Sequence, residues 1–532
     1  MSVVGKMFPL ALALAVITPL CISQGTPVTH AISGQVINSV TGQPISRALV
    51  QIGPQYGMLT DHEGRFSFDD VTEGSGGAFA SKPGYFLSDT GPSPLTQPLT
   101  LRLIPEAIIS GAVTDPMGRP IQDLHVELKM LQVRNGLRSW QQVQSALTSV
   151  AGEYRFAELR EGKYRVVTSM QVEGLPEAAS SLSFVPATYP PPESDAANSA
   201  ITLAAGDHVE ANLTPAAEKS YPVTGVINGP VNRGVSIEAE TPDGEPINAG
   251  ARFYPPTGAF RMMLPSGSYH LRVRSFAQPQ PLFGTREISI AHAPLEGISV
   301  SLEPQINIPV EVDYQAVATN TQQAPSTGPP SLYFTLENAD PDGPLRTISA
   351  EPVRVPGSAQ VVEPGGPLVM RNVEPGRYVL QAQVNPPWYL ASASCDNLDL
   401  MRNPLVVSAG TGVCTIHAVV RNDPSTLRWS IAASDTLKLN GSVFVSIIPL
   451  GNLTAYAQSS LATNAKRAGP PLQDEFSSLA PGRYLVVALP HQQEIPYRDP
   501  EAMKAYMPLG QEVTLPINGQ VEMQLQPAAG EP

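Results

Sequence analysis

Charged residues are scarce in this sequence, at 15% of 532 residues, whereas soluble domains average about 25%. The chain has a net charge of −14, and its lysines and arginines form no dense cluster. A phosphate-binding face needs such a cluster, so we expect no nucleic-acid partner. The low charge content is also unusual for a helix-rich cytosolic protein, and it favours an all-β class.

Residues that carry catalysis or bind metal are also few. The eight histidines are scattered and form no ligand cluster, and only three cysteines occur. His491 and Glu494 have the His-x-x-Glu spacing of zinc peptidases, but no later histidine completes the site. No Gly-x-Ser-x-Gly elbow and no phosphate-binding loop occurs. We therefore predict no enzyme activity and no catalytic, cofactor-binding or metal-binding residue.

Beyond the N-terminus, no apolar run is long enough to cross a bilayer. At the start, a lysine precedes an apolar run over residues 7–22 that ends in small residues, which is typical of a signal peptide. We predict that residues 1–23 are removed by cleavage after Ser23. A lipid on Cys21 is disfavoured because the large Leu20 precedes it. The expected protein is secreted, periplasmic or on the cell surface, with no transmembrane segment after cleavage.

Proline and glycine, in contrast, are abundant, at 55 and 43 residues, while 42% of the chain is apolar. The apolar content exceeds that of a disordered chain. Evenly spread prolines break helices and central strands, so they imply many short elements joined by turns. A chain of this length predicts four or five domains of roughly 100 to 150 residues.

One phrase recurs with a long period. A glycine, a spacer and a tyrosine open a β-rich run at Gly162, Gly267, Gly376 and Gly482, which are separated by 105, 109 and 106 residues. A period of this length indicates tandem domains rather than a solenoid of small units.

Two further phrases mark where the repeats begin and end. Alternating apolar and polar residues around a glycine open three repeats, at 32–36, 109–113 and 223–226. Alternating runs also close the repeats, at 99–103, 209–213, 298–302, 416–420 and 521–525. A period of two predicts strands with one buried face. We therefore expect five β-sandwich modules, at 24–104, 105–216, 217–304, 305–421 and 422–532.

Two segments depart from this pattern. Residues 315–330 are polar and proline-rich, which predicts a long loop inside the fourth module. Asp499, Pro500 and Glu501 have the order of a helix N-cap, a proline at the first helical position and an acidic first turn. We predict one short helix from there through Met507.

Residues 32–71 and 109–167 resemble the carboxypeptidase regulatory-like domain, a seven-stranded transthyretin-like sandwich, with residues 60–66 at the centre of its pattern. The join between the first two copies is similar to that of multi-copy exported versions from acidobacteria. The resemblance is good over 32–215, fair over 223–304 and partial beyond. It implies tandem transthyretin-like or carbohydrate-binding-like sandwiches and a carbohydrate as one ligand class. In the enzymes that give the family its name, catalysis resides in a separate zinc peptidase domain. The strand order of the last two modules stays open.

The residues of these phrases predict structural roles. The side chain of Asp61 can cap a turn in which Gly64 takes a positive φ, so that Phe66 faces the core. A calcium loop would need more oxygen ligands than Asp61 and Glu63 supply. The tyrosines of the Gly-x-Tyr phrases resemble the corner tyrosines of sandwiches, whose hydroxyls bond a nearby backbone group.

Exposed aromatic rings, which sugar sites usually need, have few candidates because only three tryptophans occur. Trp429 lies in an apolar run and is predicted to be core. Trp140 lies in a polar insertion over 133–149, where its ring either contacts a sugar or folds back over its own sandwich. Trp388 and Tyr389 follow two prolines at a strand start, where one ring can be exposed.

Cys395 and Cys414 are the two cysteines that remain after the predicted cleavage. An even number in an oxidising compartment favours a disulfide, and two free buried thiols are the alternative. Both cysteines lie at predicted strands of the fourth module. Neighbouring strands can bring their Cα atoms within the roughly 4.4 to 6.8 Å that a disulfide needs.

Three functions fit these observations. The first is a non-catalytic scaffold or adhesion-type protein of the periplasm or cell surface, whose partners are other envelope or extracellular proteins. The second is a polysaccharide-binding protein, and the third is a set of accessory domains of an extracellular hydrolase complex. Coplanar exposed rings on one module would favour glycan binding, and a bare polar surface would favour the scaffold.

Overall fold

The computed structural model describes residues 29–528 apart from 88–92, 94, 96–97, 174–180, 192–198, 232–233, 243, 245, 277–280, 318–329, 340–346, 354–365, 409–413, 433–441, 464–471 and 491. The predicted signal peptide, most of the predicted 315–330 loop and His491 therefore lie outside the described residues. The chain separates into two compact units. The first holds residues 1–107, 158–160 and 205–207, and the second holds the remainder.

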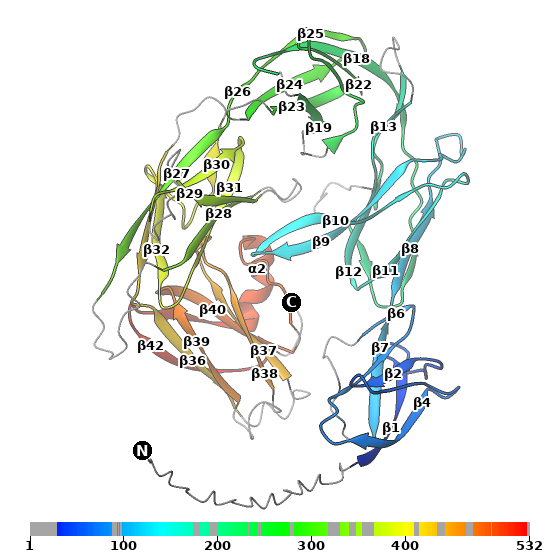
Figure 1. Ribbon diagram of the computed structural model, residues 1–532, viewed down its shortest axis with the longest axis vertical. Helices are drawn as coiled ribbons and strands as arrows, with labels where there is room; N and C mark the ends of the chain where they lie inside the picture. The colour runs from blue at the N-terminus through cyan, green and yellow to red at the C-terminus, as the bar shows by residue number, and fades with distance from the viewer. Residues whose placement is uncertain are drawn as a thin grey trace, which may run out of the picture. The chain divides into compact units, whose positions relative to one another are not determined.

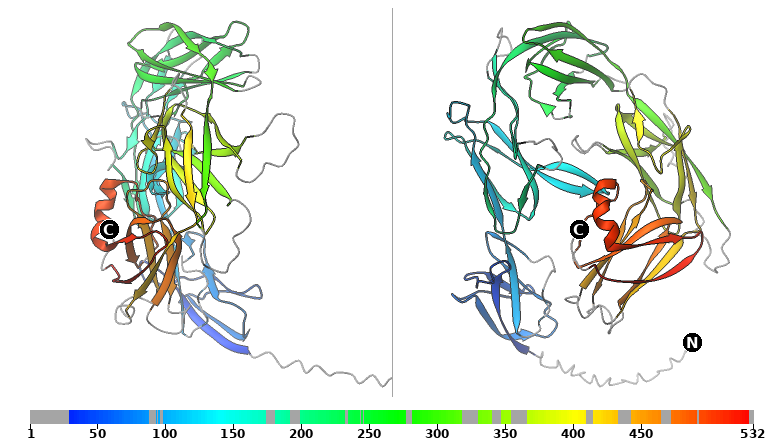
Figure 2. Two further views of the ribbon diagram at one scale, coloured as in Figure 1. Left: turned by 90° about the vertical axis from the view of Figure 1, so that its left-hand side faces the viewer. Right: turned by 180° about the vertical axis from the view of Figure 1, so that it is seen from behind.

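Short strands make up nearly all of the regular structure (Figures 1 and 2). Across the part of the chain that the structure describes, helix is confined to α2 (Pro500–Tyr506) and the single 3-10 turn η1 (Met507–Leu509). Asp499 caps α2 by accepting hydrogen bonds from the backbone N–H groups of Glu501 and Ala502, each at 3.0 Å. The all-β fold class and the short helix are both confirmed.

A four-stranded sheet forms the first half of the N-terminal sandwich. Its inner strand β1 (Thr29–Asn38) pairs antiparallel with β4 (Arg65–Thr72) and parallel with β7 (Leu99–Pro105). The predicted opening strand thus lies directly beside the predicted closing strand. The parallel pairing brings the two ends of the repeat together.

The same order recurs along the described chain, with the opening strand always between the counterpart of β4 and the closing strand, which runs parallel to the opening strand. The four further sets are β11 (Glu153–Leu159), β8 (Ala107–Ala112) and β17 (His208–Glu210); β22 (Ala259–Pro265), β18 (Ala217–Asn228) and β25 (Leu295–Ser301); β30 (Leu368–Val373), β27 (Ile306–Gln315) and β35 (Ile416–Arg421); and β39 (Leu472–Leu479), β36 (Ser425–Ile431) and β42 (Gln520–Leu525). For this set of three strands, the order that the sequence left open in the last two modules therefore matches that of the first.

Each set of three strands faces further strands that form a second layer. We call the set and its second layer together a strand group, and we number the groups 1 to 5 along the chain. In groups 2 to 5, the Gly-x-Tyr phrase opens a strand of the second sheet, namely β12 (Gly162–Thr168), β23 (Gly267–Ser275), β31 (Gly376–Val384) and β40 (Gly482–Leu489).

The second sheet of group 1 has the order β3 (Tyr56–Leu59), β2 (Leu49–Ile52), β5 (Ala78–Ser81), and β6 (Tyr85–Phe86) pairs with β7. In group 2, β10 (Leu137–Leu147), β9 (His125–Arg134), β12 and β15 (Thr188–Tyr189) follow one another, and β16 (Ile201–Leu203) also pairs with β12. In group 3 the order is β20 (Pro246–Ile247), β19 (Val235–Glu240), β23, β24 (Leu282–Ile290), β26 (Glu303–Pro304), while β21 (Arg252–Tyr254) extends the first sheet at β22.

Group 4 is one continuous sheet of nine strands, in which β29 (Thr347–Pro352) joins β30 to β28 (Leu332–Asn338). From β28 the sheet continues through β31 to β34 (Leu405–Val407), and at its other end β32 (Tyr389–Cys395) and β33 (Leu398–Asp399) follow β35. Group 5 adds β38 (Gln458–Thr463), β37 (Ser442–Pro449), β40 and β41 (Gly510–Leu515).

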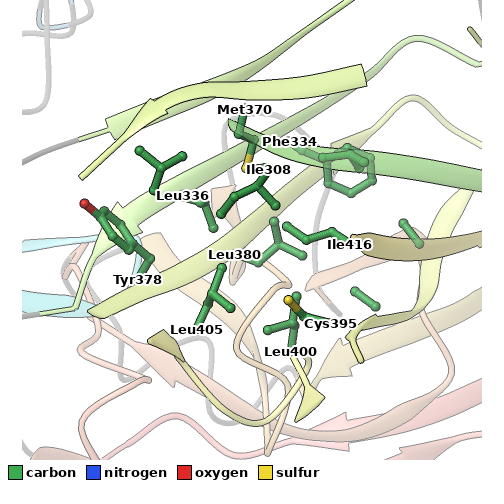
Figure 3. Close-up of a cluster of buried hydrophobic side chains, with 14 of the residues drawn as sticks. Ile308, Phe334, Leu336, Met370, Tyr378, Leu380, Cys395, Leu400, Leu405 and Ile416 are labelled. Carbon is green, nitrogen blue, oxygen red and sulfur yellow. The ribbon is translucent and has the colours of Figure 1, made fainter. Parts of the chain in front are cut away.

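The core of each group lies between its two layers of strands, which in group 4 are the two halves of one sheet. In group 4, Ile308 and Ile416 from one half of the sheet and Leu336 and Leu380 from the other are all at most 2% exposed. Figure 3 shows these side chains pointing toward one another, with Tyr378 beside them. Burial of both inner faces against each other is what makes each group a sandwich.

The glycines of the opening phrases are required by close packing. A Cβ at Gly34 would lie 2.1 Å from the carbonyl oxygen of Leu99 on β7 and 2.7 Å from the ring of Phe66 on β4. A Cβ at Gly111 would lie 2.1 Å from the carbonyl oxygen of Ala211, and a Cβ at Gly225 would lie 2.2 Å from that of Ile298. In these three groups the opening strand thus fits against its two partners because it has no side chain at this position.

Groups 2 and 3 share a backbone ladder. Two strands, β13 (Gln171–Glu173) and β14 (Ser181–Phe184), precede position 216, where the sequence predicts a module boundary. β14 nevertheless pairs antiparallel with β18, the opening strand of group 3. A segment of the second predicted module is therefore part of the third group's sheet.

Candidate functional site

The Asp-x-x-Gly phrase is a capped turn, as predicted. Oδ1 of Asp61 accepts hydrogen bonds from the backbone N–H groups of Glu63 and Arg65, at 2.9 and 2.8 Å. Gly64 takes a φ of 70°, and Phe66 is 3% exposed. The carboxylate of Asp61 is thus used by the turn.

The tyrosines of the Gly-x-Tyr phrases in groups 3 to 5 are corner tyrosines, as predicted. The hydroxyls of Tyr269, Tyr378 and Tyr484 each donate to the backbone carbonyl four residues upstream, at 3.2, 2.9 and 2.7 Å. Burial, together with the nearby Glu218, raises the pKa of Tyr269 to about 12. The hydroxyls of these rings therefore serve the folding of the sandwiches.

Trp140 lies on β10, and the insertion predicted over 133–149 is the hairpin formed by β9 and β10. Its ring is 9% exposed, and the guanidinium carbon of Arg165 on β12 lies 4.1 Å from the ring centroid. The cation covers the face that a sugar would need. The structure therefore places the ring of Trp140 against its own sheet.

Tyr389 and Trp388 differ in their surroundings. Tyr389 is 7% exposed, and its hydroxyl donates to Oδ1 of Asp423 at 3.0 Å. Burial, with the adjacent Asp423, raises the pKa of Tyr389 to about 12. Trp388 is only half-buried and packs edge-on against Tyr314, with ring centroids 6.2 Å apart. Of the pair, Trp388 keeps part of its ring accessible.

Trp388 lines a groove of about 550 Å³ between the sheets of groups 4 and 5. We call this the neutral groove, because none of its lining side chains carries a charge at neutral pH. Its residues are Asn135, Ala382, Gln383, Val384, Trp388, Tyr389, Leu390, Asn452, Thr454, Ala455, Tyr456, Gln458, Ser478, Leu479, Ala480 and Tyr484. Ligand pockets of roughly 300 to 1,000 Å³ are usual, so its size suits a small or extended ligand.

The tip of the β9–β10 hairpin reaches this groove. Nδ2 of Asn135 donates to Oε1 of Glu337 on β28 at 2.7 Å, and the carbonyl of Gly136 accepts from the backbone N–H of Arg498 at 3.0 Å. The guanidinium of Arg138 forms an ion pair with Asp499. Group 2 thereby contributes to the rim of a groove built from groups 4 and 5.

Arg498 lies at the centre of this contact and is 8% exposed. Its Nη2 donates to Oε1 of Gln381 at 2.6 Å, and its guanidinium carbon lies 5.2 Å from the ring centroid of Tyr497. Its Nε and Nη1 have no hydrogen-bond partner. Burial lowers the pKa of Arg498, and the negative Glu337 nearby partly offsets this.

Sequence reasoning did not find Arg498, Tyr456 or the groove. Their neighbours come from segments far apart in the chain, which no local pattern reveals. The hairpin did carry a signal, because Asn-Gly between alternating apolar runs favours a tight hairpin turn with both residues at positive φ. Asn135 and Gly136 indeed have φ of 49° and 79°.

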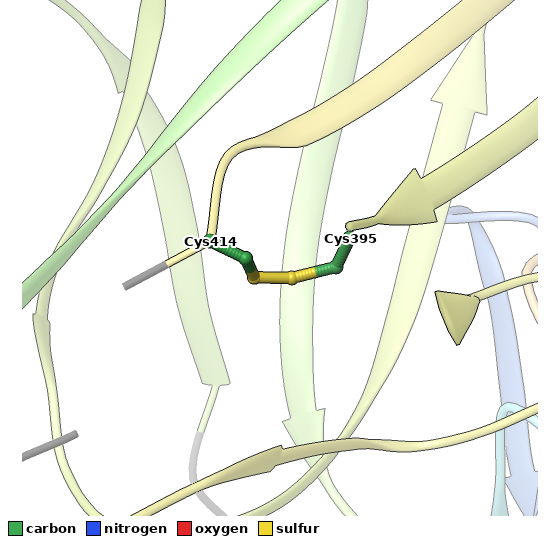
Figure 4. Close-up of a disulfide and its surroundings, with 2 residues drawn as sticks. All are labelled: Cys395 and Cys414. Atoms are coloured by element: carbon green, nitrogen blue, oxygen red, sulfur yellow. A yellow bond between two sulfur atoms is a disulfide. The ribbon is translucent and has the colours of Figure 1, made fainter. Parts of the chain in front are cut away.

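The structure joins Cys395 and Cys414 by a disulfide (Figure 4). Cys395 ends β32, and Cys414 lies two residues before β35. These strands pair antiparallel with Cys395 opposite Ile416, so the two Cα atoms lie 5.6 Å apart. Cys395 is 4% exposed and belongs to the core of group 4.

Among the described residues, no group of three or more His, Cys, Asp or Glu side chains is placed to hold a metal ion. Within the same residues, no helix has the length and apolar character of a membrane span.

The strand pairings define the chain as a protein of tandem β-sandwiches. No family model matches the chain, and no curated protein matches it. Similar solved structures include a streptococcal ancillary pilin (11% identity, covering 52% of this chain and 100% of the pilin, TM-score 0.19). Others are BcpA, the major pilin subunit of Bacillus cereus (10%, 60% and 99%, 0.16), and the full-length RrgB pilus protein of Streptococcus pneumoniae (8%, 80% and 98%, 0.16). At TM-scores this low a shared architecture does not follow, so the fold assignment rests on the strand pairings.

Proposed function

We propose that this chain is exported and acts as a non-catalytic scaffold in the periplasm or at the cell surface, where it holds envelope or extracellular proteins. The apolar N-terminal segment supports export. The observation that carries the scaffold role is a buried ion cluster between groups 3 and 4. This cluster involves Arg272, Arg274, Glu240 and Glu374.

Glu374, which precedes β31, is the shared partner of two arginines on β23. It pairs with the guanidinium of Arg272, and its Oε1 lies 2.8 Å from Nε of Arg274. Nη1 of Arg272 also lies 3.3 Å from Oε2 of Glu240. The side chains of Arg272, Glu240 and Glu374 are only 13%, 9% and 10% exposed. Burying charges costs several kcal/mol per ion, so the cluster favours one relative placement of the two groups in which every charge has a partner.

Other junctions of the second unit are also tied. The β14–β18 ladder links groups 2 and 3. Between groups 4 and 5, Asp423 accepts from Nε of Arg421 at 2.9 Å and from Tyr389, and its carbonyl accepts from the N–H of Asn518 at 3.2 Å. Fixed junctions suit a scaffold, whose task is to hold attachment points at set positions.

The test uses the full chain expressed in a bacterium with an outer membrane. We expect the mature protein outside the cytoplasm, beginning at Gln24, and no turnover of peptide or glycoside substrates by the purified protein. Small-angle scattering should show a broader distribution of shapes for Glu374→Gln than for wild type, while Glu522→Gln, an exposed substitution, should leave it unchanged. Cytoplasmic retention, catalytic turnover or identical scattering of Glu374→Gln would contradict the scaffold proposal.

Polysaccharide binding is a second candidate function. One observation supports it, namely that the half-buried ring of Trp388 lines the neutral groove. Retention of the purified chain on a panel of immobilised polysaccharides tests this candidate.

A further inference from the structure

The neutral groove differs in chemistry from the other hollows of groups 4 and 5. One of these is lined by Arg428, Asp474, Glu475 and Glu522, and another by Asp396, Asp399, Arg402 and Arg483. The neutral groove instead combines four aromatic residues, Trp388, Tyr389, Tyr456 and Tyr484, with side-chain amides and hydroxyls. A charged ligand would find no counter-ion in its lining, so the lining suits an uncharged, polar ligand.

The arrangement of these groups matches the two faces of a sugar ring. The rings of Trp388 and Tyr456 are half-buried, and each leaves part of its apolar surface in the groove. Gln383 and Gln458 are exposed and lie on β31 and β38, so their amides can donate to and accept from hydroxyls. Aromatic faces cover the C–H surface of a sugar, while amides pair its hydroxyl edge.

We infer that the neutral groove binds a segment of an uncharged oligosaccharide, and that the β9–β10 hairpin completes the site. This inference rests on the glycan-binding candidate and adds to it the ligand class and the contributing elements. Trp388 provides the stacking ring, the amides of Gln383 and Gln458 read the hydroxyls, and Asn135 closes the rim.

The hairpin's part follows from its contacts. Asn135 is the residue of group 2 that lines the groove. Its side chain is oriented by the 2.7 Å hydrogen bond to Glu337. The hairpin tip is held by the hydrogen bond from the N–H of Arg498 to the carbonyl of Gly136 and by the ion pair of Arg138 with Asp499. Residues from groups 2, 4 and 5 therefore meet at one site, and a fragment lacking group 2 would lack its rim.

Titration calorimetry of the full chain tests the inference with cellohexaose, xylohexaose and maltohexaose as neutral probes and hexagalacturonate as the acidic probe. We expect binding of a neutral probe and none of the acidic one. Trp388→Ala should weaken binding about tenfold through loss of the stacking surface. Because Trp388 also packs against Tyr314, the double variant Gln383→Ala/Gln458→Ala, which leaves the core untouched, provides a second measure. It should weaken binding about tenfold by removing two hydrogen bonds.

Gln524→Ala is the matched control, because Gln524 is an exposed amide on β42 that lines the charged hollow beside Arg428. It should bind as wild type does, whereas Asn135→Ala should bind severalfold more weakly. Binding of hexagalacturonate alone, or neutral binding that the groove variants leave unchanged, would overturn the inference while glycan binding itself stood. Failure of the chain to bind any of these probes or any immobilised polysaccharide would overturn both.

Discussion

Gly34 shows at the scale of one residue how the recurring phrases are used. Its missing side chain leaves room for the carbonyl of Leu99 and the ring of Phe66. Asp61 caps the turn before that ring, and the corner tyrosines of later groups bond their own backbone. The residues that stand out in the sequence therefore serve the fold. Apart from Tyr484, the residues that line the groove lie outside these repeated phrases.

Substitution of Gly34 tests this steric argument. Gly34→Ala should destabilise the first unit by about 3 kcal/mol, because the new methyl group overlaps backbone atoms that cannot move aside cheaply. Gly57→Ala is the matched control, since a Cβ there has its nearest neighbours 3.8 to 4.0 Å away. Scanning calorimetry of the full chain should show a lowered transition for Gly34→Ala only. Equal melting of the two variants would refute the close-packing explanation.

Buried tyrosines predict a loss of stability at alkaline pH. The pKa of Tyr389 is about 12 in the folded chain, above its value near 10 in an unfolded one. The folded state holds this proton more tightly, so the stabilisation is complete below pH 10 and disappears as the pH rises through 12. In Tyr389→Phe, urea unfolding should therefore depend less steeply on pH in this window, by up to about 1.4 kcal/mol per pH unit. The control is Tyr333→Phe, because Tyr333 is 65% exposed, and the pH dependence of its unfolding should match that of wild type. Parallel pH profiles for wild type and both variants would rule this explanation out.

At the scale of elements, the sequence predicted local features well and distant pairings poorly. Opening and closing strands, the capped helix α2 and the strands beside Cys395 and Cys414 each have a local signature of alternation, capping or turn residues. The pairing of β14 with β18 across position 216 has no such signature, because backbone ladders depend on no particular side chain. The same holds for the contact of Asn135 with Glu337, which are 202 residues apart.

The disulfide ties β32 to the approach of β35. Its closed loop spans a separation of 19 residues, so the chain-entropy model gives about 3 kcal/mol of stabilisation. Mass spectrometry of the non-reduced, exported protein should find a peptide pair linked through Cys395 and Cys414, and reduction should lower the stability of group 4 by that amount. Two alkylatable thiols in the folded protein would contradict the disulfide.

The hairpin contact predicts a local change in hydrogen exchange. Although burial opposes it, hydrogen bonds from the N–H of Ala502 and from Arg138 hold the pKa of Asp499 below its ordinary value. Asp499 is therefore ionised at neutral pH, and Arg138→Ala removes its partner. The amide of Arg498, which donates to Gly136, should then exchange about two- to fivefold faster. The control is Arg65→Ala, which removes the ion pair between Arg65 and Glu63, whose side chains are 67% and 66% exposed. It should leave the exchange rate of the Arg498 amide unchanged. An unchanged rate in Arg138→Ala as well would show that other contacts alone hold the hairpin.

At the scale of the whole molecule, one strand order is repeated while the junctions differ. The opening strand lies between the counterpart of β4 and the closing strand in all five strand groups of the described chain. The junctions use a backbone ladder in one place, a buried ion cluster in another and Asp423 in a third. Each junction thus uses contacts of its own, and the neutral groove is lined by residues of groups 2, 4 and 5.

Limited proteolysis of the full, exported chain, read by mass spectrometry, tests the modular account most directly. Five sandwiches predict that the first cuts fall near residues 104, 216, 304 and 421, where the sequence predicts one module to end and the next to begin, or within the predicted polar loop 315–330. The fragments released should begin or end at these positions and resist further digestion. A single resistant core that spans several of these boundaries would contradict the account.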